Sequence, residues 1–440
     1  MIRWVEAELS EEAMARGRPA GLRLETAERR QVAFQQTCLD DLLSADHRAR
    51  QVWEYVEELD LSALYGEVRT TAMASGRPAI DPAILVALWL YATLEGVGSA
   101  RLLDRLCKSD LAYLWLLGGV SVNYHTLADF RTKAGPVLDE LLCQSLTGLI
   151  AAGAVDVRTL AVDGMKMQSL ASGRSFRSAG RLAELHRAAV ETVGKLRAEI
   201  DEDPAASERR VKARRLAAAE DRERRLQQAR KAQAKIEQRR DEAAVEQRRT
   251  GKRKDQKEAR ASTSDPDARI MKMGDGSYRP AYNVQFKTAA DGAHVVGVSV
   301  AEQGNDYGLL NDAINEIERR YGVTPHDVLA DGGYYSKADI EALHKRRIEL
   351  FCPLPKTGKS DPTLPRRDDG PGTIAWRQRM ASEEGQVAYR RRFATERPHA
   401  HMRNHGLRRL LVRGVDKVKA VVLWHVHAFN FLQFKRLGLA

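Results

Sequence analysis

The sequence of 440 residues predicts a mixed α/β fold with an all-α N-terminal region and a long helical insertion. Three observations indicate this class. Helical apolar periodicity extends from about residue 36 to 150, short apolar strands alternate with helices after residue 160, and a highly charged segment separates the first strand from the second. Hydrophobic residues make up 43% of the chain, which is enough to build such cores and excludes wholesale disorder.

The N-terminal region has the signals of a compact helical domain. Asp81 is followed by Pro82, a helix N-cap with proline at the first helical position, and the apolar run after it is typical of a buried helix. Another helix is expected near Thr126, which we predict to cap it with Asp129 as the partner acid. We expect residues 1–150 to form this domain.

A charged helical insertion is predicted at 180–260. Residues 181–260 hold 24 Lys and Arg against 16 Asp and Glu, so eight of the chain's eleven net positive charges lie there. Asp203-Pro204 should divide the segment into two helices, and at 1.5 Å per residue the longer one could reach roughly 80 Å. Because this segment has few large apolar residues, it cannot bury one face in an ordinary core, and we expect an arm, a dimer element or a DNA-facing rod. A solvated helix of mixed charge is the alternative.

The remaining sequence alternates between strands and helices. Strands are predicted at 160–164, 281–288, 294–300, 328–331 and 349–353, helices at 309–321, 337–347, 383–405 and 415–436, and a loop at 356–375. Three strands followed by helix, strand, helix and strand is the order of a ribonuclease-H-like core. We therefore predict such a domain over residues 155–440, interrupted by the insertion.

Two aspartates stand at the ends of predicted strands. Asp163 and Asp331 each follow an apolar strand, and each precedes glycine. Ligands bind at such strand ends in α/β sheets, and the predicted core places the first and fourth strands side by side, so the two carboxylates should converge. Taken singly, either aspartate could simply cap a turn.

A third acid is expected on the helix after the last strand. Tyr389, Arg392, Glu396 and Arg403 are spaced so that they share one helical face. An ordinary ion pair between Arg392 and Glu396 is the alternative to a site that holds phosphates and a metal. The candidate acids are Glu383, Glu384 and Glu396.

Three carboxylates suit Mg²⁺, or Mn²⁺, because these hard ions prefer oxygen ligands. Two such ions about 3.5–4 Å apart stabilise the attacking and leaving oxygens of an in-line phosphoryl displacement. Water would attack first and nick a strand, and a DNA 3′-hydroxyl would attack next and join strands.

Several classes of protein are disfavoured by the sequence. No run of about 18 apolar residues occurs, so no membrane span is predicted. The four cysteines form no CxxC, which argues against a zinc site or a disulfide framework and fits a cytoplasmic protein. A nucleotide-binding enzyme is disfavoured because GxxxxGK[ST] and GxGxxG are both missing. The net charge of +11 suggests a polyanionic partner.

Several blocks together resemble a DDE-type transposase of a bacterial insertion sequence. Residues 76–82 are similar to the N-terminal helical domain of this group, 162–166 to its first-acid segment and 330–336 to its second-acid segment. Residues 263–269 and 276–285 resemble its most distinctive block. The resemblance extends over roughly residues 40–440.

The family's third motif is Tyr, two residues, Arg, three residues, Glu, six residues and Lys. It falls on Tyr389, Arg392 and Glu396, and ends on Arg403 in place of lysine. The resemblance implies that two metal ions are bound by Asp163, Asp331 and Glu396. It also implies DNA contacts, which we expect from Tyr389, Arg392, Arg403, Lys166 and Arg279.

Partners and alternatives follow from the same resemblance. It implies double-stranded DNA as terminal inverted repeats and target, and binding of the DNA ends by residues 1–150. It also implies a homodimer on that DNA and action at the bacterial nucleoid. Trp376 is expected either to hold an extruded base or, with better odds, to pack against its neighbouring helix. The alternatives are a metal-dependent nuclease without strand transfer and a catalytically inactive DNA-binding protein descended from a transposase.

Overall fold

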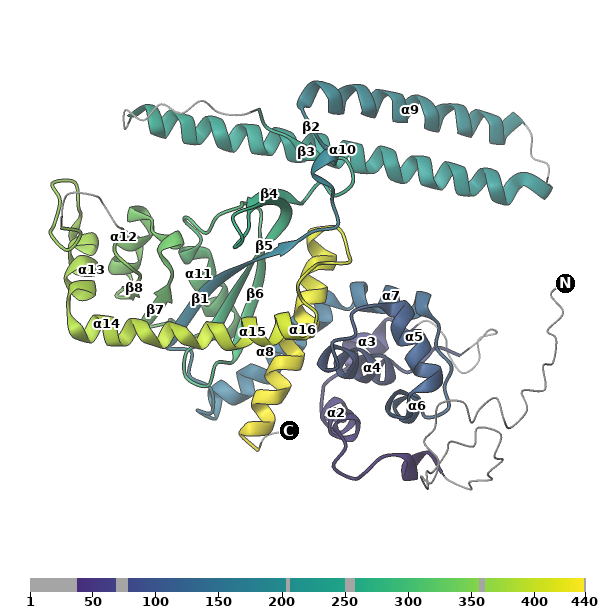
Figure 1. The fold of residues 1–440 in the computed structure, drawn as a ribbon, viewed down its shortest axis with the longest axis horizontal. Helices are drawn as coiled ribbons and strands as arrows, with labels where there is room; N and C mark the ends of the chain where they lie inside the picture. The colour runs from purple at the N-terminus through teal and green to yellow at the C-terminus, as the bar shows by residue number, and fades with distance from the viewer. Residues whose placement is uncertain (1–37, 69–77, 203–205, 250–257, 356–360, 439–440) are drawn as a thin grey trace, which may run out of the picture.

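The computed structural model describes residues 38–68, 78–202, 206–249, 258–355 and 361–438 (Figure 1). Parts of four sequence-based assignments lie outside these ranges: the polar N-terminal residues, the start of the 76–82 block, the Asp203-Pro204 break and a stretch of the 356–375 loop. None of the helices within the described ranges combines the length and apolar character needed to cross a membrane.

A mixed sheet forms the centre of the fold. Its order is β6, β5, β1, β7, β8, and β4 pairs with the first part of β5. β1 is antiparallel to β5 and parallel to β7, which is parallel to β8. This order confirms the predicted ribonuclease-H-like core. The strands are β1 Thr159–Gln168, β4 Arg269–Lys272, β5 Tyr278–Ala289, β6 Val295–Ala301, β7 Asp327–Ala330 and β8 Glu349–Phe351.

Tight turns and crossover helices connect these strands. β5 and β6 form the predicted hairpin, and its turn contains Gly292 at a φ of +88°, a conformation that glycine adopts without steric cost. α11 (Leu310–Tyr321) joins β6 to β7, and α12 (Lys337–Lys345) joins β7 to β8 after the short 3₁₀ turn Gly332–Tyr334. The helices therefore occur where the alternation of the sequence predicts them.

The N-terminal region is helical, as predicted. Asp81 caps α4 by accepting a hydrogen bond from the Ala83 amide, with Pro82 at the first helical position. The prediction that Thr126 caps the later helix is wrong, because Asn123 accepts from the His125 and Thr126 amides and so starts the helix earlier. The helices are η1 Leu39–Leu42, α2 Arg48–Glu57, α3 Ser62–Gly66, α4 Pro82–Leu94, α5 Ala100–Ser109, α6 Leu111–Leu117, α7 Tyr124–Lys133 and α8 Gly135–Ala151.

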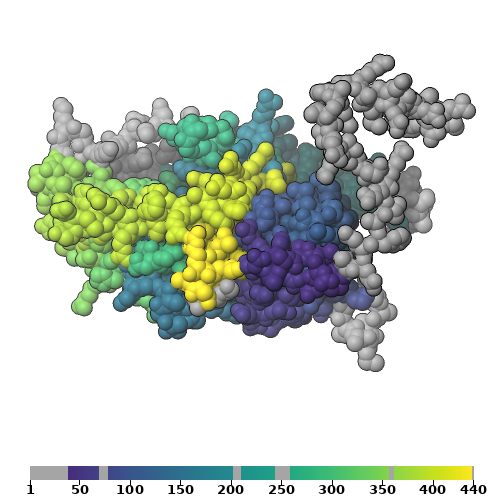
Figure 2. All heavy atoms as spheres, turned by 60° about the horizontal axis from the view of Figure 1, so that its bottom comes forward, coloured from purple at the N-terminus to yellow at the C-terminus, as the bar shows by residue number. Residues whose placement is uncertain are grey.

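The C-terminal helix α16 (Val415–Arg436) joins the helical region to the sheet. It is buried along most of its length, and Figure 2 shows the yellow C-terminal segment lying against the purple N-terminal helices. Trp424 donates to the Arg131 carbonyl on α7, and Asn430 bonds the backbone of Val295 on β6. One continuous hydrophobic core results. The division into domains over residues 1–150 and 155–440 stays a prediction.

The insertion is a helical hairpin that projects from the sheet (Figure 1). α9 (Ala179–Glu202) and α10 (Ala206–Arg249) are joined near the predicted break, and a two-stranded sheet of β2 (Phe176–Arg177) and β3 (Ala261–Ser262) forms the base. The 44 residues of α10 correspond to about 66 Å, somewhat less than the length expected from sequence. We call α9 and α10 the arm; Leu182, Ala189, Leu226, Ala229 and Ala261 form a small core at its base.

The helices after β8 differ from the prediction. α13 (Pro371–Ala381) begins inside the predicted loop, because the distant carboxylate of Glu341 accepts from the Gly372 and Thr373 amides and caps it. The predicted helix 383–405 is divided into α14 (Glu383–Arg390), the 3₁₀ turn η4 (Arg391–Thr395) and α15 (Glu396–Asn404).

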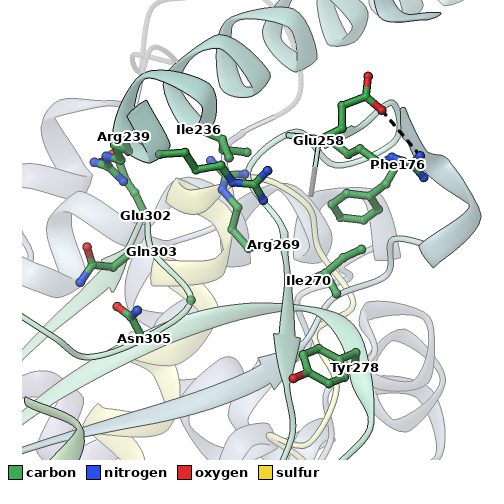
Figure 3. Close-up of a pocket in the computed structure, with 13 residues that line it drawn as sticks. Phe176, Ile236, Arg239, Glu258, Arg269, Ile270, Tyr278, Glu302, Gln303 and Asn305 are labelled. Carbon is green, nitrogen blue, oxygen red and sulfur yellow. Dashed lines mark hydrogen bonds and ion pairs between the residues drawn. The ribbon is translucent and has the colours of Figure 1, made fainter. Parts of the chain in front are cut away.

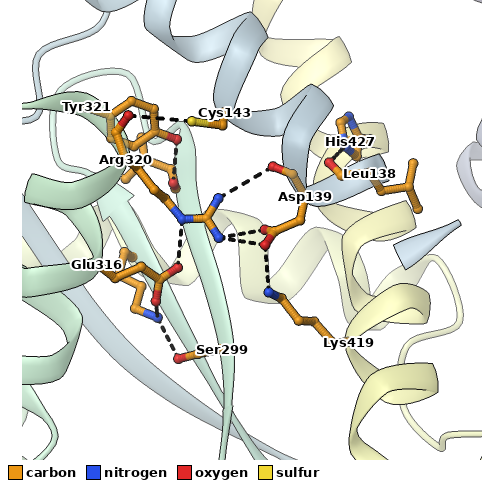
Figure 4. Close-up of polar contacts among 11 residues, drawn as sticks. Leu138, Asp139, Cys143, Ser299, Glu316, Arg320, Tyr321, Lys419 and His427 are labelled. Atoms are coloured by element: carbon orange, nitrogen blue, oxygen red, sulfur yellow. Dashed lines mark hydrogen bonds and ion pairs between the residues drawn. The ribbon is translucent and has the colours of Figure 1, made fainter. Parts of the chain in front are cut away.

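A buried ionic network links α8, β5, α11 and α16 (Figure 4). Lys287 is 1% exposed, and its ammonium lies 2.6 Å from both the Glu316 carboxylate and the Ser299 hydroxyl. Arg320 joins Glu316 to Asp139 of α8, which also pairs with Lys419 of α16. Burial lowers the pKa of Lys287, whereas the Glu316 charge opposes that shift. The network ties the helical region to the sheet.

Removing one member of this network should destabilise the fold. Lys287→Met leaves the Glu316 charge buried with one partner fewer, so we expect the free energy of unfolding to fall by about 3 kcal/mol. Urea denaturation measures the change. The double substitution Lys287→Met with Glu316→Leu removes both charges and should recover part of the loss. Equal unfolding midpoints for wild type and Lys287→Met would contradict this role of the network.

Candidate active site

Asp163 and Asp331 lie next to each other where β7 ends beside the middle of β1. The prediction that the first strand ends at Asp163 is wrong, because pairing with β5 continues β1 to Gln168. β1 and β7 are parallel and in register up to Val162 and Ala330, so the two aspartates that follow these residues emerge side by side. Burial raises the pKa of both carboxyl groups. The charge of Asp163 raises the pKa of Asp331 further. The structure thus brings together two of the acids that the sequence singles out.

The segment after β8 packs against the first of these aspartates. One oxygen of Asp163, Oδ2, lies 3.2 Å from Arg392 Nη1 and 3.3 Å from Thr395 Oγ1. His399 Nδ1 is 3.6 Å from the same oxygen. Burial lowers the pKa of His399 to about 3, with the charges of Arg403 and Arg392 acting in the same direction, so this imidazole is neutral at physiological pH. Sequence reasoning did not find Thr395 or His399 as neighbours of Asp163.

Glu396 is adjacent to this contact but does not join it. It directly follows Thr395 as the first residue of α15, and its side chain is exposed. No contact of Glu396 with Asp163 or Asp331 is present in the described part of the chain. Nor do any three Asp, Glu, His or Cys side chains within the described ranges form a group able to hold a metal ion.

The 3₁₀ turn before α15 explains why Glu396 does not join this contact. The prediction that Tyr389, Arg392, Glu396 and Arg403 share one face assumed a continuous α-helix with 3.6 residues per turn. In η4 residues three apart are aligned instead, so Arg392 and Thr395 both contact Asp163, whereas the Glu396 side chain is exposed. The shared face is therefore wrong for this conformation.

A fourth acid, Asp306, lies beside the two aspartates. Its Oδ1 accepts hydrogen bonds from the side-chain amides of Asn283 (2.8 Å) and Gln285 (2.7 Å) on β5. The charge of Asp306 contributes to the raised pKa of both Asp163 and Asp331. Sequence reasoning did not single out Asp306. The sequence does hold one indication of this contact: Asn283 and Gln285 are two residues apart on a buried strand, so both amides lie on one face.

The glycines after the two aspartates make room for this arrangement. A Cβ at Gly164 would lie 2.5 Å from Asp306 Oδ1 and 2.7 Å from Gln285 Nε2. A Cβ at Gly333 would lie 2.9 Å from Asp331 Oδ1, which accepts a hydrogen bond from the Gly333 amide. A side chain at either position would collide with the acids, which explains the glycine in each motif by close approach.

The predicted DNA-contacting residues fall into three places. Tyr389 lies beside Arg392, whose guanidinium carbon is 6.0 Å from the tyrosine ring centre, and both are near Asp163. Lys166 and Arg403 line one pocket between β1 and α15, together with Arg408. Arg279 is not close to the acids.

The position of Arg279 follows from the β5 register. Phe286 is the residue paired with Asp163, and Arg279 stands seven residues earlier on the strand, a distance of about 23 Å at 3.3 Å per residue. It forms an ion pair with Asp275 at 2.7 Å.

A second, larger pocket separates the arm from the sheet (Figure 3). Its side on α10 contributes Arg239, which pairs with Glu302 at the end of β6. Its opposite side carries Tyr278, which is 70% exposed. The pocket reaches Asn305, the residue before Asp306. An arginine-lined pocket with an exposed aromatic ring therefore begins next to the acids.

Trp376 is a core residue. It is 1% exposed, it donates to the Cys352 carbonyl at 3.0 Å, and its ring lies 5.2 Å from that of Tyr335. It lies on α13 and not in a loop, so the packing role is the one that the structure supports. In this conformation the ring has no face available for an extruded base.

The raised pKa of Asp331 predicts a pH-dependent stability of the metal-free protein. An acid whose pKa is raised by folding destabilises the fold when ionised, and this penalty vanishes as pH falls to the ordinary aspartate value of about 3.9. Asp331→Asn should therefore raise the melting temperature at pH 7 by a few degrees and leave it unchanged near pH 4. Thermal melts in a chelator test this, and a lower melting temperature for the variant at pH 7 would contradict it.

Comparison with known families gives two matches. Residues 37–133 match a family described as Transposase domain (DUF772), and residues 241–431 match one described as Transposase DDE domain. The second match contains Asp331 and Glu396, whereas Asp163 precedes it on the far side of the insertion and joins it through the pairing of β1 with β7. Searches of curated proteins and of solved structures find no match. The chain belongs to the DDE-type transposases of insertion sequences.

Proposed function

We propose that this transposase cuts DNA at the ends of its insertion sequence and joins the freed 3′ ends to a target, with divalent metal ions. The observation that carries the proposal is the adjacency of Asp163, in the middle of β1, and Asp331, at the end of the parallel strand β7, with the segment that bears Glu396 packed on Asp163. Members of this family generally use divalent metal ions. A nuclease that does not join strands would use the same acids and remains the second candidate.

The side chains present fit Mg²⁺ or Mn²⁺. Carboxylate oxygens are the ligands that these ions prefer. Burial raises the pKa of Asp163 and Asp331, so a bound cation would favour their ionised forms. Asp163, Asp331 and Glu396 would hold two ions, which would stabilise charge on the attacking and leaving oxygens. Thr395 is hydrogen-bonded to Asp163, and the exposed Glu396 that follows it would reach the aspartates through a rearrangement of the η4–α15 segment.

Arg392 and Tyr389 have a defined part in this scheme. Without DNA, the Arg392 guanidinium neutralises Asp163. We propose that it moves to a DNA phosphate when DNA and metal arrive, because a divalent ion then supplies the charge that Asp163 needs. Tyr389 lies against Arg392 and would orient it. The attacking groups are water and then a DNA 3′-hydroxyl, so no side chain becomes covalently attached to DNA.

DNA would follow the basic surfaces around the acids. The Lys166, Arg403 and Arg408 pocket lies on the α15 side, and the arm with its pocket lies on the β6 side. The N-terminal helical region would read the inverted repeat. A homodimer is proposed because two ends must be brought together.

The test uses duplex oligonucleotides made from the inverted repeats that flank the gene. With Mg²⁺ we expect a nick at the element's end and then a joined product with target DNA, both resolved on denaturing gels. A scrambled end is the control. Cutting of both sequences without joined product would favour the nuclease, and no cutting of either would overturn the proposal.

Shortening the arm should reduce DNA affinity and not stability. Replacing residues 194–217 by a short glycine–serine turn removes the distal half of the arm and keeps the small core at its base. We expect affinity for end DNA to fall about tenfold at 0.1 M salt, with a shallower salt dependence, because fewer phosphates are contacted. Fluorescence anisotropy at several salt concentrations measures both, and thermal melts check the fold. Unchanged affinity with loss of dimerisation would show that the arm binds the partner protomer.

A further inference from the structure

We infer that Asp306 is a fourth carboxylate of the metal site, with its Oδ2 facing the space between Asp163 and Asp331. This inference rests on the proposed function, and it assigns to the site a residue outside the three acids of the family motif. The position of the Asp306 carboxylate supports it. Oδ2 lies 3.5 Å from the point where a Gly333 Cβ would stand, and Asp331 Oδ1 lies 2.9 Å from the same point.

The side chain of Asp306 is held from one side. Its Oδ1 accepts from Asn283 and Gln285, and these amides are almost fully buried. The Gln285 amide is oriented in turn, because the buried Tyr334 hydroxyl donates to its Oε1 and leaves Nε2 for Asp306. The Asn283 Oδ1 accepts a second hydrogen bond from Gln285, which ties the two amides together. A carboxylate fixed through one oxygen presents the other in a defined direction.

The charges around Asp306 point to a cation. The hydrogen-bond partners described for its carboxylate are the neutral amides of Asn283 and Gln285, and no ion pair of Asp306 occurs in the described residues. Arg392 is the cation that faces the aspartates, and it is bonded to Asp163. Asp306, Asp163 and Asp331 therefore place three carboxylates around one guanidinium. A divalent ion between these carboxylates would supply the positive charge that one guanidinium leaves short.

The two glycines support the same assignment. Gly164 leaves the space that Asp306 Oδ1 and the Gln285 amide occupy. A neutral, smaller residue at 306 would need neither the glycine nor the amides. Together, Gly164 and the two amides of β5 hold the Asp306 carboxylate next to Asp163 and Asp331.

The experiment compares Asp306→Asn with Asp312→Asn, a matched change at an exposed residue of α11. Asparagine keeps an oxygen for the Asn283 and Gln285 amides, so the fold should survive. Mn²⁺ affinity of the full-length protein without DNA is measured by electron paramagnetic resonance. We expect Asp306→Asn to weaken Mn²⁺ binding at least tenfold and Asp312→Asn to leave it unchanged.

Thermal stability without metal separates this role from a structural one. Removing a repelling charge should raise the melting temperature of Asp306→Asn, whereas loss of a structural contact would lower it. Equal Mn²⁺ affinity in wild type and Asp306→Asn would overturn this inference and leave the proposed function standing. A wild-type protein that binds no Mn²⁺, with or without end DNA, would overturn both.

Discussion

Asp163→Asn should abolish DNA cleavage while leaving DNA binding nearly unchanged. Asp163 lies beside Asp331 on the neighbouring strand, and its carboxylate contacts Arg392 and Thr395, so it links the sheet to the η4–α15 segment. A metal clamp is worth several kcal/mol of transition-state stabilisation, and every 1.4 kcal/mol is a factor of ten in rate. We therefore expect the nicking rate to fall by at least about a thousandfold in single-turnover assays.

The controls for Asp163→Asn come from the same surface. Binding of end DNA should stay within about threefold of wild type, because asparagine leaves the basic side chains in place. Asp156 lies just before β1, where it pairs with Arg158, and is remote from Asp163 and Asp331. Asp156→Asn should therefore cut normally. Cleavage by Asp163→Asn at more than a tenth of the wild-type rate would remove Asp163 from the site.

Glu396→Gln should cause a loss of cleavage of similar size. In this conformation its side chain is exposed and separate from the aspartates, so an effect on cleavage would show that it joins them in the complex with DNA and metal. Because an exposed glutamate contributes little to stability, the melting temperature should hardly change.

Glu383→Gln and Glu384→Gln are the matched controls for this change. Both are acids in the first turn of α14, at the start of the same C-terminal segment. We expect them to cleave normally. A normal rate for Glu396→Gln together with a loss in one of these variants would move the third acid to α14, and normal rates in all three would leave the site with two aspartates and Asp306.

Much of the fold follows from local pattern in the sequence. Alternating apolar residues, the turn at Gly292 and the Asp81-Pro82 cap act over a few residues, so the strand order and the adjacency of Asp163 and Asp331 could be inferred. The start of α13 could not, because Glu341 caps it from thirty residues away along the chain. Local pattern carries no information on such a distant partner.

The details of the site depend on which residues share a helical face and on contacts between residues distant in the sequence. A short 3₁₀ turn brings Arg392 and Thr395 to Asp163 and leaves Glu396 exposed, and spacing alone does not reveal such a turn. Asp306 follows β6 in a loop, and its role depends on amides from β5 that pattern analysis treats as ordinary strand residues.

The central claim is that Asp163, Asp331 and Glu396 meet around two divalent ions. Its most direct test is a crystal structure of the protein with end DNA and Mn²⁺, in which anomalous scattering locates the ions. We expect two peaks about 3.5–4 Å apart, with oxygens of all three carboxylates about 2.1 Å from a peak. Peaks elsewhere, or Glu396 still turned toward solvent while the ions are bound, would contradict the claim.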